Sequence, residues 1–298
     1  MSSPERIVEG VRLSNPDKIL WPEQGLTKGE LADYYVSIAD VMLPHVAGRP
    51  VTMVRCPTGA EKKCFYQRHT ASGVLSELKE VTVPGFDDPY LYIEDVAGLI
   101  AMVQMGTLEI HPWGVRIDAP DRPDRIIFDL DPDEGLGFGD VIHAALEIRE
   151  RLAAMGLTSF VKTTGGKGLH VVLPIAPVAE WRAAKAFAKG FSELMAADAP
   201  DRYLTKISKA EREGRIFIDY LRNDATSTAV GPYSTRSRPG APVATPLEWE
   251  EVKEGLDPKA FTICTVPDRV RALKRDPWAE MDMHKQCIPT LPSVADRN

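Results

Sequence analysis

A strand-like run that ends in two acids constrains the fold more than any other segment of the chain. It reads Arg125-Ile-Ile-Phe-Asp-Leu-Asp-Pro132. Side chains alternate between the two faces of a strand, so Asp129 and Asp131 project to one side and Leu130 to the other, toward a core. Two such carboxylates repel each other unless a cation joins them, and Mg²⁺ or Mn²⁺ prefers hard oxygen ligands. The alternative is a strand that ends in an Asp-Pro turn with both acids solvated.

A glycine-rich turn is predicted between two strands further along the chain. It reads Thr163-Thr-Gly-Gly-Lys-Gly-Leu-His170. The glycines let backbone N–H groups face an anion, and Thr164, Lys167 and His170 add a hydroxyl, a positive charge and an imidazole. The spacing is not that of a Walker P-loop, and a strand rather than a Rossmann helix follows. We favour phosphate binding over a hairpin whose glycines serve only the turn.

A third acid, Asp219, follows an apolar strand-like run, and Arg222 lies three residues beyond it. Alone, this pattern favours a strand-end carboxylate paired with an arginine. Combined with the acid pair and the phosphate turn, it supplies the parts of a two-metal nucleotidyl-transfer site. Three carboxylates and the triphosphate together offset the charge of two divalent cations, and the remaining task is to position the reacting groups.

Helical and strand-like segments are mixed along the chain. Thr27 and Glu30 have the spacing of a capping box that begins a helix. Amphipathic helices are predicted over residues 139–155 and 179–197, and Pro246 takes the first position of a short helix. Hairpin-like strand pairs occur beside helical crossovers. The pattern predicts an α+β fold with mixed or antiparallel sheets flanked by helices.

Composition narrows the class of protein. The 298 residues are 44% hydrophobic, an ordinary globular balance, and the formal net charge is −7. This net charge argues against tight non-specific DNA binding, although it does not describe a local patch. No apolar run is long enough to span a bilayer, and the N-terminal residues lack the apolar stretch of a signal peptide. A cytoplasmic protein is therefore expected.

The four cysteines form no CxxC pair and no cluster with zinc-finger spacing. Cys56 and Cys64 flank a loop with His69 beyond it, which allows a metal knuckle. We favour reduced, buried thiols instead, because disulfides are rare in cytosolic proteins.

These motifs together resemble the polymerase domain of bacterial ligase D, in the archaeo-eukaryotic primase superfamily. The likeness runs from LSNPDKILWP at residues 13–22 to the region of Trp249. It is carried by DLDP at 129–132, TTGGKGLH at 163–170 and FIDY at 217–220. The resemblance implies a primase-polymerase-like core in one domain over residues 1–298. Residues up to about 120 would contact the DNA end and the nucleotide, and residues from about 121 to 240 would form a palm-like catalytic core.

The resemblance also assigns roles to residues. The catalytic metal ligands would be Asp129, Asp131 and Asp219. The nucleotide would be held by Arg55, His111, Thr164, Lys167, His170, Arg222 and Arg236. The DNA end would be held by Lys18 and Lys28, which match a 5′-phosphate as point charges, and by the stacking pair Phe65 and Tyr66. Arg212 would help to organise a template or primer strand. Thr164 and Tyr66 depart from the serine and phenylalanine that the family commonly has; the hydroxyl and the ring are kept.

The implied activity is the addition of nucleotides, ribonucleotides by preference, to 3′ ends at gaps and double-strand breaks in bacterial non-homologous end joining. The implied cofactor is Mn²⁺ or Mg²⁺ in a two-metal site. The implied partners are DNA ends with a 5′-phosphate, nucleoside triphosphates, a DNA ligase and the Ku end-binding protein, at the nucleoid and away from any membrane. No ligase or nuclease motif occurs, so the sequence is either a stand-alone polymerase or an isolated domain.

Three alternatives remain open from the sequence. One is a primase of the same superfamily, which would start strands without a primer. Another is a metal-dependent phosphodiesterase or nuclease, because carboxylate–metal sites also hydrolyse phosphate esters. The third is a catalytically silent module that binds DNA ends.

Overall fold

The computed structural model describes residues 5–71, 73–207 and 211–291. The chain forms two compact units, each built from segments that are far apart in the sequence. The first unit comprises Met1–Trp113, Val230–Thr245 and Lys259–Asp276, and the second comprises Gly114–Ala229, Pro246–Pro258 and Pro277–Asn298. The assignment of both units to one functional domain stays a prediction. So does the division near residue 120 between DNA-end and nucleotide contacts on one side and the catalytic core on the other.

The first unit begins with two short hairpins and a pair of helices. Thr27 caps the first helix as predicted: its hydroxyl accepts a hydrogen bond from the Glu30 backbone N–H at 3.2 Å, and the Glu30 carboxylate accepts one from the Thr27 N–H at 2.7 Å. The helical segment is interrupted at Ile38 and ends before Gly48, whose φ is +65°. These elements are β1 (Glu5–Val8), β2 (Val11–Ser14), β3 (Ile19–Trp21), β4 (Leu26–Thr27), α1 (Lys28–Ser37) and α2 (Ala39–Val46).

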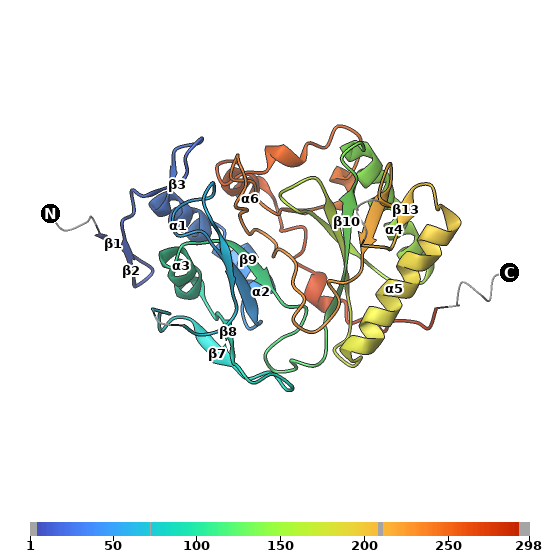
Figure 1. Cartoon of the computed structure of the whole chain (residues 1–298), viewed down its shortest axis with the longest axis horizontal. Coiled ribbons are helices and arrows are strands. Elements are labelled where there is room, and N and C mark those ends of the chain that lie inside the picture. The colour runs from blue at the N-terminus through green and yellow to red at the C-terminus, as the bar shows by residue number, and fades with distance from the viewer. Residues whose placement is uncertain (1–4, 72, 208–210, 292–298) are drawn as a thin grey trace. The chain divides into compact units, whose positions relative to one another are not determined.

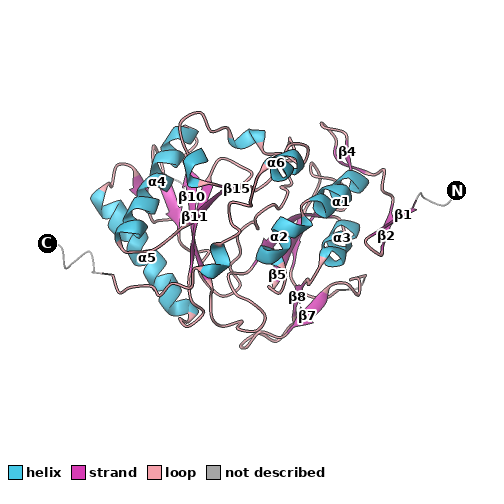
Figure 2. Cartoon of the chain, turned by 180° about the vertical axis from the view of Figure 1, so that it is seen from behind, coloured by secondary structure: helices cyan, strands magenta, loops and turns pink. Residues whose placement is uncertain are grey.

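A three-stranded antiparallel sheet in the order β6-β5-β9 forms the centre of the first unit. Helix α3 packs against β9 and against α1, and Figure 2 shows α1, α2 and α3 grouped beside β5. Strand β9 is buried at nearly every position, so a polar side chain on it must find partners within the protein. The remaining elements are β5 (Val51–Arg55), β6 (Phe65–Gln67), β7 (Lys79–Val81), β8 (Tyr90–Tyr92), α3 (Val96–Gln104), β9 (Thr107–Pro112) and α6 (Val266–Ala272).

The second unit is a six-stranded sheet in the order β13-β14-β10-β12-β11-β15, covered by two long helices. All strand pairs are antiparallel except β13 with β14. The strands are β10 (Arg125–Pro132), β11 (Phe160–Thr163), β12 (Leu169–Pro174), β13 (Tyr203–Leu204), β14 (Ile216–Asp219) and β15 (Pro246–Leu247), and the helices are α4 (Phe138–Ala154) and α5 (Trp181–Asp198). Both helices lie where the sequence predicts them.

Helices α4 and α5 pack against β10 on the same side of the sheet (Figure 1). Phe128 on β10 meets Phe191 on α5 with ring centroids 4.9 Å apart, and both rings are buried. Because faces alternate, Phe128 and Leu130 enter this apolar layer while Asp129 and Asp131 point to the opposite face. The predicted α+β fold is confirmed. Because alternate residues of β10 are buried under the helices, Asp129 and Asp131 lie together on the opposite face of the sheet.

One local prediction is wrong. Pro246 was expected at the first position of a helix, but Pro246–Leu247 is the edge strand β15, followed by a 3-10 helix at Trp249–Glu251. Proline lacks an N–H donor, so it is also tolerated at a sheet edge, where only one side of the strand is paired. No helix in the described ranges is long and apolar enough to cross a membrane.

Candidate active site

Four polar side chains form a row across the second unit's sheet. The strand registers pair Lys162 with His170, His170 with Asp129, and Asp129 with Asp219. Directly opposed residues of antiparallel strands point to the same face, so the row runs over β11, β12, β10 and β14 on the face opposite the helices. The His170 Nε2 lies 3.3 Å from the Asp129 carboxylate. Two of the three predicted metal ligands therefore lie side by side.

Asp131, the third predicted ligand, lies two residues beyond Asp129 on the same face of β10. Its carboxylate accepts a hydrogen bond from Arg212 Nη1 at 2.6 Å, and Lys167 Nζ lies 3.6 Å away. The Arg212 guanidinium also covers the ring of Phe217, the residue paired with Asp131 on β14, at 4.3 Å. Arg212 was predicted as a DNA contact, and the structure places it in the acid cluster.

Arg222 bridges the other two acids. Its Nε lies 3.3 Å from the Asp129 carboxylate and its Nη2 3.1 Å from that of Asp219. The sequence alone favoured the pair with Asp219, and the structure adds the contact to Asp129. Arg222 and Lys167 are also predicted triphosphate ligands, so a phosphate held by these two cations would lie next to the three carboxylates.

Burial and neighbouring charges shift the pKa values of this row. Burial acts to raise the pKa of Asp129, but the charges and hydrogen bonds of His170, Arg222 and Lys162 outweigh it and hold the pKa well below its usual range. Burial raises the pKa of Asp219, and Asp129 adds to that effect while Arg222 opposes it. Burial and Lys162 lower the pKa of His170 to about 4, so its imidazole is neutral at pH 7.

The glycine turn packs tightly against β10. A Cβ atom at Gly168 would lie 2.3 Å from the Leu130 carbonyl oxygen, so only glycine fits there. Gly165 has a φ of +65°. The Thr164 hydroxyl donates to the Gly168 carbonyl at 3.1 Å, which closes the turn, and Lys167 Nζ donates to the Pro132 carbonyl. The predicted phosphate contacts of Thr164, Lys167 and His170 stay predictions.

The three carboxylates have the chemistry of a site for Mg²⁺ or Mn²⁺. In the described part of the chain, no group of three or more His, Cys, Asp or Glu side chains is arranged to hold a metal ion. Arginine and lysine side chains contact the acids instead. The donor set nevertheless fits a hard cation, because Asp129, Asp131 and Asp219 offer only oxygen ligands from one face of two adjacent strands.

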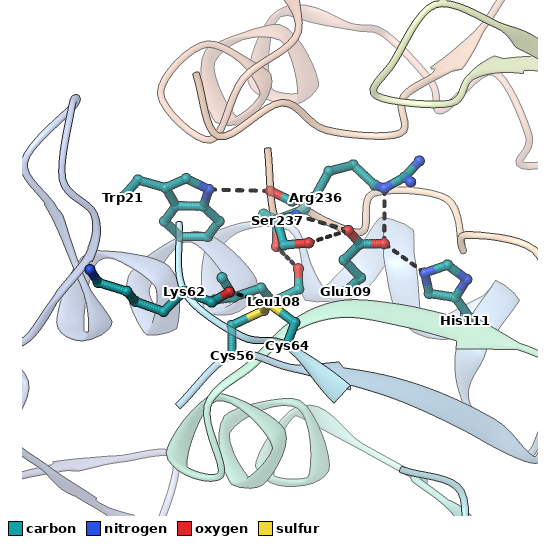
Figure 3. Close-up of a disulfide and its surroundings, with 10 residues drawn as sticks. Trp21, Cys56, Lys62, Cys64, Leu108, Glu109, His111, Arg236 and Ser237 are labelled. Carbon is teal, nitrogen blue, oxygen red and sulfur yellow. Dashed lines mark hydrogen bonds and ion pairs between the residues drawn. A yellow bond between two sulfur atoms is a disulfide. The ribbon is translucent and has the colours of Figure 1, made fainter. Parts of the chain in front are cut away.

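A second polar cluster lies in the first unit (Figure 3). The Glu109 carboxylate accepts hydrogen bonds from His111 Nε2 at 2.8 Å and from Arg236 Nε at 3.0 Å. Ser237 donates to the same carboxylate through its backbone N–H and its hydroxyl. Two predicted nucleotide ligands, His111 and Arg236, are thus brought together by a residue that the sequence did not single out.

Arg55 and the aromatic pair form another group in the first unit. Arg55 Nε donates to the Met105 carbonyl at 2.8 Å and Nη1 to the Gln67 side chain at 2.6 Å. Its guanidinium lies 5.3 Å from the Phe65 ring centre. Phe65 is 43% exposed and Tyr66 70% exposed. This exposure leaves both rings accessible to a base.

Lys18 and Lys28 lie close enough together to interact electrostatically. Lys28 is buried, and its Nζ donates to the Ser14 carbonyl at 3.0 Å and to the Gln104 side chain at 2.6 Å. Lys18 Nζ donates to the Pro57 carbonyl. Burial, with a smaller effect from Lys18, lowers the pKa of Lys28 to about 8. Two neighbouring ammonium groups with neutral oxygen partners suit a phosphate anion.

The cysteine prediction is wrong. Cys56 and Cys64 form a disulfide, which joins the end of β5 to the start of β6 (Figure 3). This bond also excludes a knuckle that uses both thiols with His69, whose ring instead contacts Tyr90. Cys264 and Cys287 are free and exposed rather than buried. Sequence spacing could not reveal the pair, because disulfide geometry depends on the distance between the strand ends.

A pocket of about 410 Å³ lies at the other end of the second unit's sheet. Its walls include Asp124, which precedes β10, and Pro174, which ends β12. Asp129 lies five residues along β10 from Asp124, roughly 16 Å of strand. The pocket lining shares no residue with the acid row.

Sequence reasoning missed Lys162 and Glu109. Lys162 is 2% exposed and Glu109 5% exposed. The available signal was the same in both cases: a single charged residue within an otherwise apolar strand segment. Such a residue is seldom fully buried without partners, which makes it a candidate for a site.

A largely antiparallel sheet that gathers three carboxylates beside a glycine-rich turn has the arrangement of a nucleotidyltransferase of the polymerase class. Residues 27–278 match the family model described as LigD, primase-polymerase domain. The chain is 35% identical over 284 residues to the multifunctional non-homologous end joining protein LigD of Pseudomonas aeruginosa, and 37% identical over 250 residues to that of Mycolicibacterium smegmatis. These matches cover 94% and 83% of this chain. The chain belongs to the LigD primase-polymerase domain family.

The structural comparison agrees. The chain is similar to the polymerase domain from Mycobacterium tuberculosis ligase D in complex with DNA, with a TM-score of 0.86 and 31% identity, over 92% of this chain and 99% of that one. The matches cover only 34% and 33% of the two LigD proteins above. The chain thus spans about a third of the length of these relatives and corresponds to their polymerase part.

The disulfide predicts the number of reactive thiols. We expect the denatured, unreduced protein to show two thiols with a chromogenic thiol reagent, from Cys264 and Cys287, and four after reduction. The double variant Cys56→Ser/Cys64→Ser should show two in both states. Four thiols in the unreduced wild-type protein would contradict the disulfide.

Proposed function

We propose that this chain adds nucleotides, ribonucleotides by preference, to the 3′ end of a DNA strand at gaps and double-strand breaks, under the direction of a template. It does so as the polymerase component of bacterial non-homologous end joining. The observation that carries the proposal is the row of His170, Asp129 and Asp219 on one sheet face, with the glycine turn beside it, in a chain of the LigD primase-polymerase family.

In this proposal Asp129, Asp131 and Asp219 hold two divalent cations, Mn²⁺ or Mg²⁺. When bound, such a pair of cations activates the attacking hydroxyl and offsets the charge of the leaving pyrophosphate. The family's dependence on metal supports this assignment.

The chain's own groups bind and orient the triphosphate. Lys167 and Arg222 supply positive charge next to the carboxylates, and His170, neutral at pH 7, supplies a hydrogen bond from a buried, fixed position. Groups that are already oriented lose little freedom when substrate binds, which favours the in-line geometry of nucleotidyl transfer.

The first unit selects the DNA end. Lys18 and Lys28 bind the 5′-phosphate, and Phe65 and Tyr66 stack at the exposed base. Arg55, His111 and Arg236 contact the nucleotide. We propose that a DNA ligase and the Ku end-binding protein act on the same ends, in the cytoplasm at the nucleoid.

We predict that Asp131→Ala lowers primer extension by at least ~10²-fold, the order of magnitude for the loss of one group that stabilises transition-state charge. Extension would be measured on a gapped duplex with ribonucleotides and Mn²⁺, and binding of the same DNA should stay nearly unchanged. Asp201→Ala removes an exposed acid of the second unit and serves as the control. Clear residual extension by Asp131→Ala would contradict the metal assignment, and efficient synthesis without a primer would favour a primase.

We predict that Lys18→Ala/Lys28→Ala weakens binding of 5′-phosphorylated recessed ends by at least about tenfold, because two charge-assisted contacts are lost. Binding of the same DNA with a 5′-hydroxyl should change little. Fluorescence anisotropy with both DNAs measures the difference. The control Lys79→Ala/Lys274→Ala removes two exposed lysines of the first unit. Equal weakening on both DNAs would show that the lysines act only through general charge.

The lowered pKa of Lys28 predicts a pH dependence. Lys28 is protonated below pH 8 and loses its proton as the pH rises through about 8, so the preference for a 5′-phosphate should fall between pH 7 and pH 9. Lys28→Arg keeps its charge over this range, and its preference should not change with pH. Binding of both DNAs at several pH values tests this, and a wild-type preference that is constant from pH 7 to pH 9 would contradict it.

A further inference from the structure

Glu109 is a buried carboxylate with four hydrogen-bond donors around it. It lies on β9 and is 5% exposed. One carboxylate oxygen accepts from His111 at 2.8 Å and from Arg236 at 3.0 Å. The other accepts from the Ser237 backbone N–H at 2.9 Å and from the Ser237 hydroxyl at 2.7 Å. Figure 3 shows the carboxylate between these groups, so both oxygens are satisfied within the protein.

The segment that carries Arg236 is attached to β9 by bonds that do not involve Glu109. The Ile110 backbone N–H donates to the Ser234 hydroxyl at 2.8 Å, and the Thr235 hydroxyl donates to the Leu108 carbonyl at 2.5 Å. Trp21 Nε1 donates to the Arg236 carbonyl at 3.2 Å. The backbone is therefore held in place independently. What Glu109 adds is the orientation of two side chains, those of His111 and Arg236.

The carboxylate is ionised in this position. Burial acts to raise the pKa of Glu109, but hydrogen bonds from His111 and Ser237 and the charge of Arg236 outweigh it and hold the pKa well below its usual range. An anion that accepts four hydrogen bonds cannot be replaced by a carboxamide of the same shape, because the amide nitrogen only donates.

The two oriented side chains come from distant parts of the sequence. His111 lies two residues from Glu109 on the same strand face, whereas Arg236 lies 127 residues away. Figure 3 shows the outer nitrogens of the Arg236 guanidinium directed away from Glu109. The carboxylate thus engages the inner Nε and sets the direction in which the outer edge of the guanidinium points.

We propose that Glu109 is a positioning residue, which holds His111 and Arg236 in the one mutual geometry that binds a nucleoside triphosphate. This inference rests on the proposed function, which assigns both residues to the nucleotide. Glu109 touches neither the substrate nor the reacting atoms. It acts through the side chains of His111 and Arg236, because it restricts their conformations before the nucleotide binds.

Charge alone predicts the opposite effect to positioning. Glu109→Gln removes a negative charge beside His111 and Arg236, so simple attraction would make a polyanionic triphosphate bind more tightly. If Glu109 instead orients these side chains, the triphosphate binds more weakly although the site has become more positive. The direction of the change therefore separates the two roles.

The experiment compares ATP binding in the presence of Mn²⁺ by isothermal titration calorimetry. We expect Glu109→Gln to raise the Kd for ATP by about tenfold, the order of magnitude for the loss of oriented hydrogen bonds to charged groups. In primer extension, KM for the nucleotide should rise much more than kcat falls. Binding of DNA with a 5′-hydroxyl should be unchanged. Unchanged or tighter ATP binding would overturn the inference.

Glu147→Gln is the matched control. Glu147 lies on α4 in the second unit. It accepts hydrogen bonds from Arg151 at 2.8 Å and Tyr203 at 2.7 Å and forms an ion pair with Arg202 at 3.1 Å. Its substitution has a comparable effect on local packing but should leave the Kd for ATP unchanged. A rise in Kd as large as that of Glu109→Gln would attribute the effect to general loosening and overturn the inference.

A second variant covers the case in which Glu109→Gln does not fold. Glu109→Asp keeps the charge but shortens the side chain, so it cannot reach His111, Arg236 and Ser237 at once. Positioning predicts weaker ATP binding for this variant too, and wild-type affinity would overturn the inference.

Failure of the inference can be told apart from failure of the proposed function. If the wild-type protein extends primers but the Glu109 variants bind ATP with normal affinity, only this inference is refuted. A wild-type protein that neither binds ATP nor extends primers refutes the proposed function and the inference with it.

Discussion

The antiparallel pairing of β10 with β12 on one side and with β14 on the other is the constraint on which the second unit's site depends. It places Asp129 directly opposite both His170 and Asp219. A shift of either neighbour by one residue would turn its polar side chain to the helix-covered face. The apolar layer prevents such a shift, because Val171 on β12 and Ile218 on β14 are buried on the helix-covered face and would have to leave it. Core packing and site geometry are thus set by the same register.

Both polar clusters follow one rule, that a carboxylate largely withdrawn from water must be surrounded by donors. Asp129 is contacted by His170 and Arg222, and Glu109 by His111, Arg236 and Ser237. In each case the donors come from different segments, and the interactions keep the acid ionised despite its burial. The free energy lost by taking a charge out of water is offset by fixed hydrogen bonds, and the same bonds orient the groups proposed to bind the nucleotide.

The fold could be predicted in part because its local signals are strong. The Thr27 capping box and the two long amphipathic helices depend on residues three or four apart, and the structure has them where they were predicted. Pro246 was misplaced because proline suits both a first helical turn and an edge strand, and only the neighbouring strand β11 decides between them. The pairing of Cys56 with Cys64 was missed because it depends on how close β5 and β6 bring the two residues.

By itself, the sequence determined that Asp129 and Asp131 share a strand face and that a glycine turn with Lys167 and His170 follows, since both are local consequences of backbone geometry. It also carried enough motifs to indicate the family. Only the tertiary structure decided that Arg212 contacts Asp131, that Lys162 joins the row, and that Glu109 links His111 to Arg236. Alternation tells which face a side chain takes, but not which strand lies beside it. That choice is made by packing between segments that are far apart in the chain.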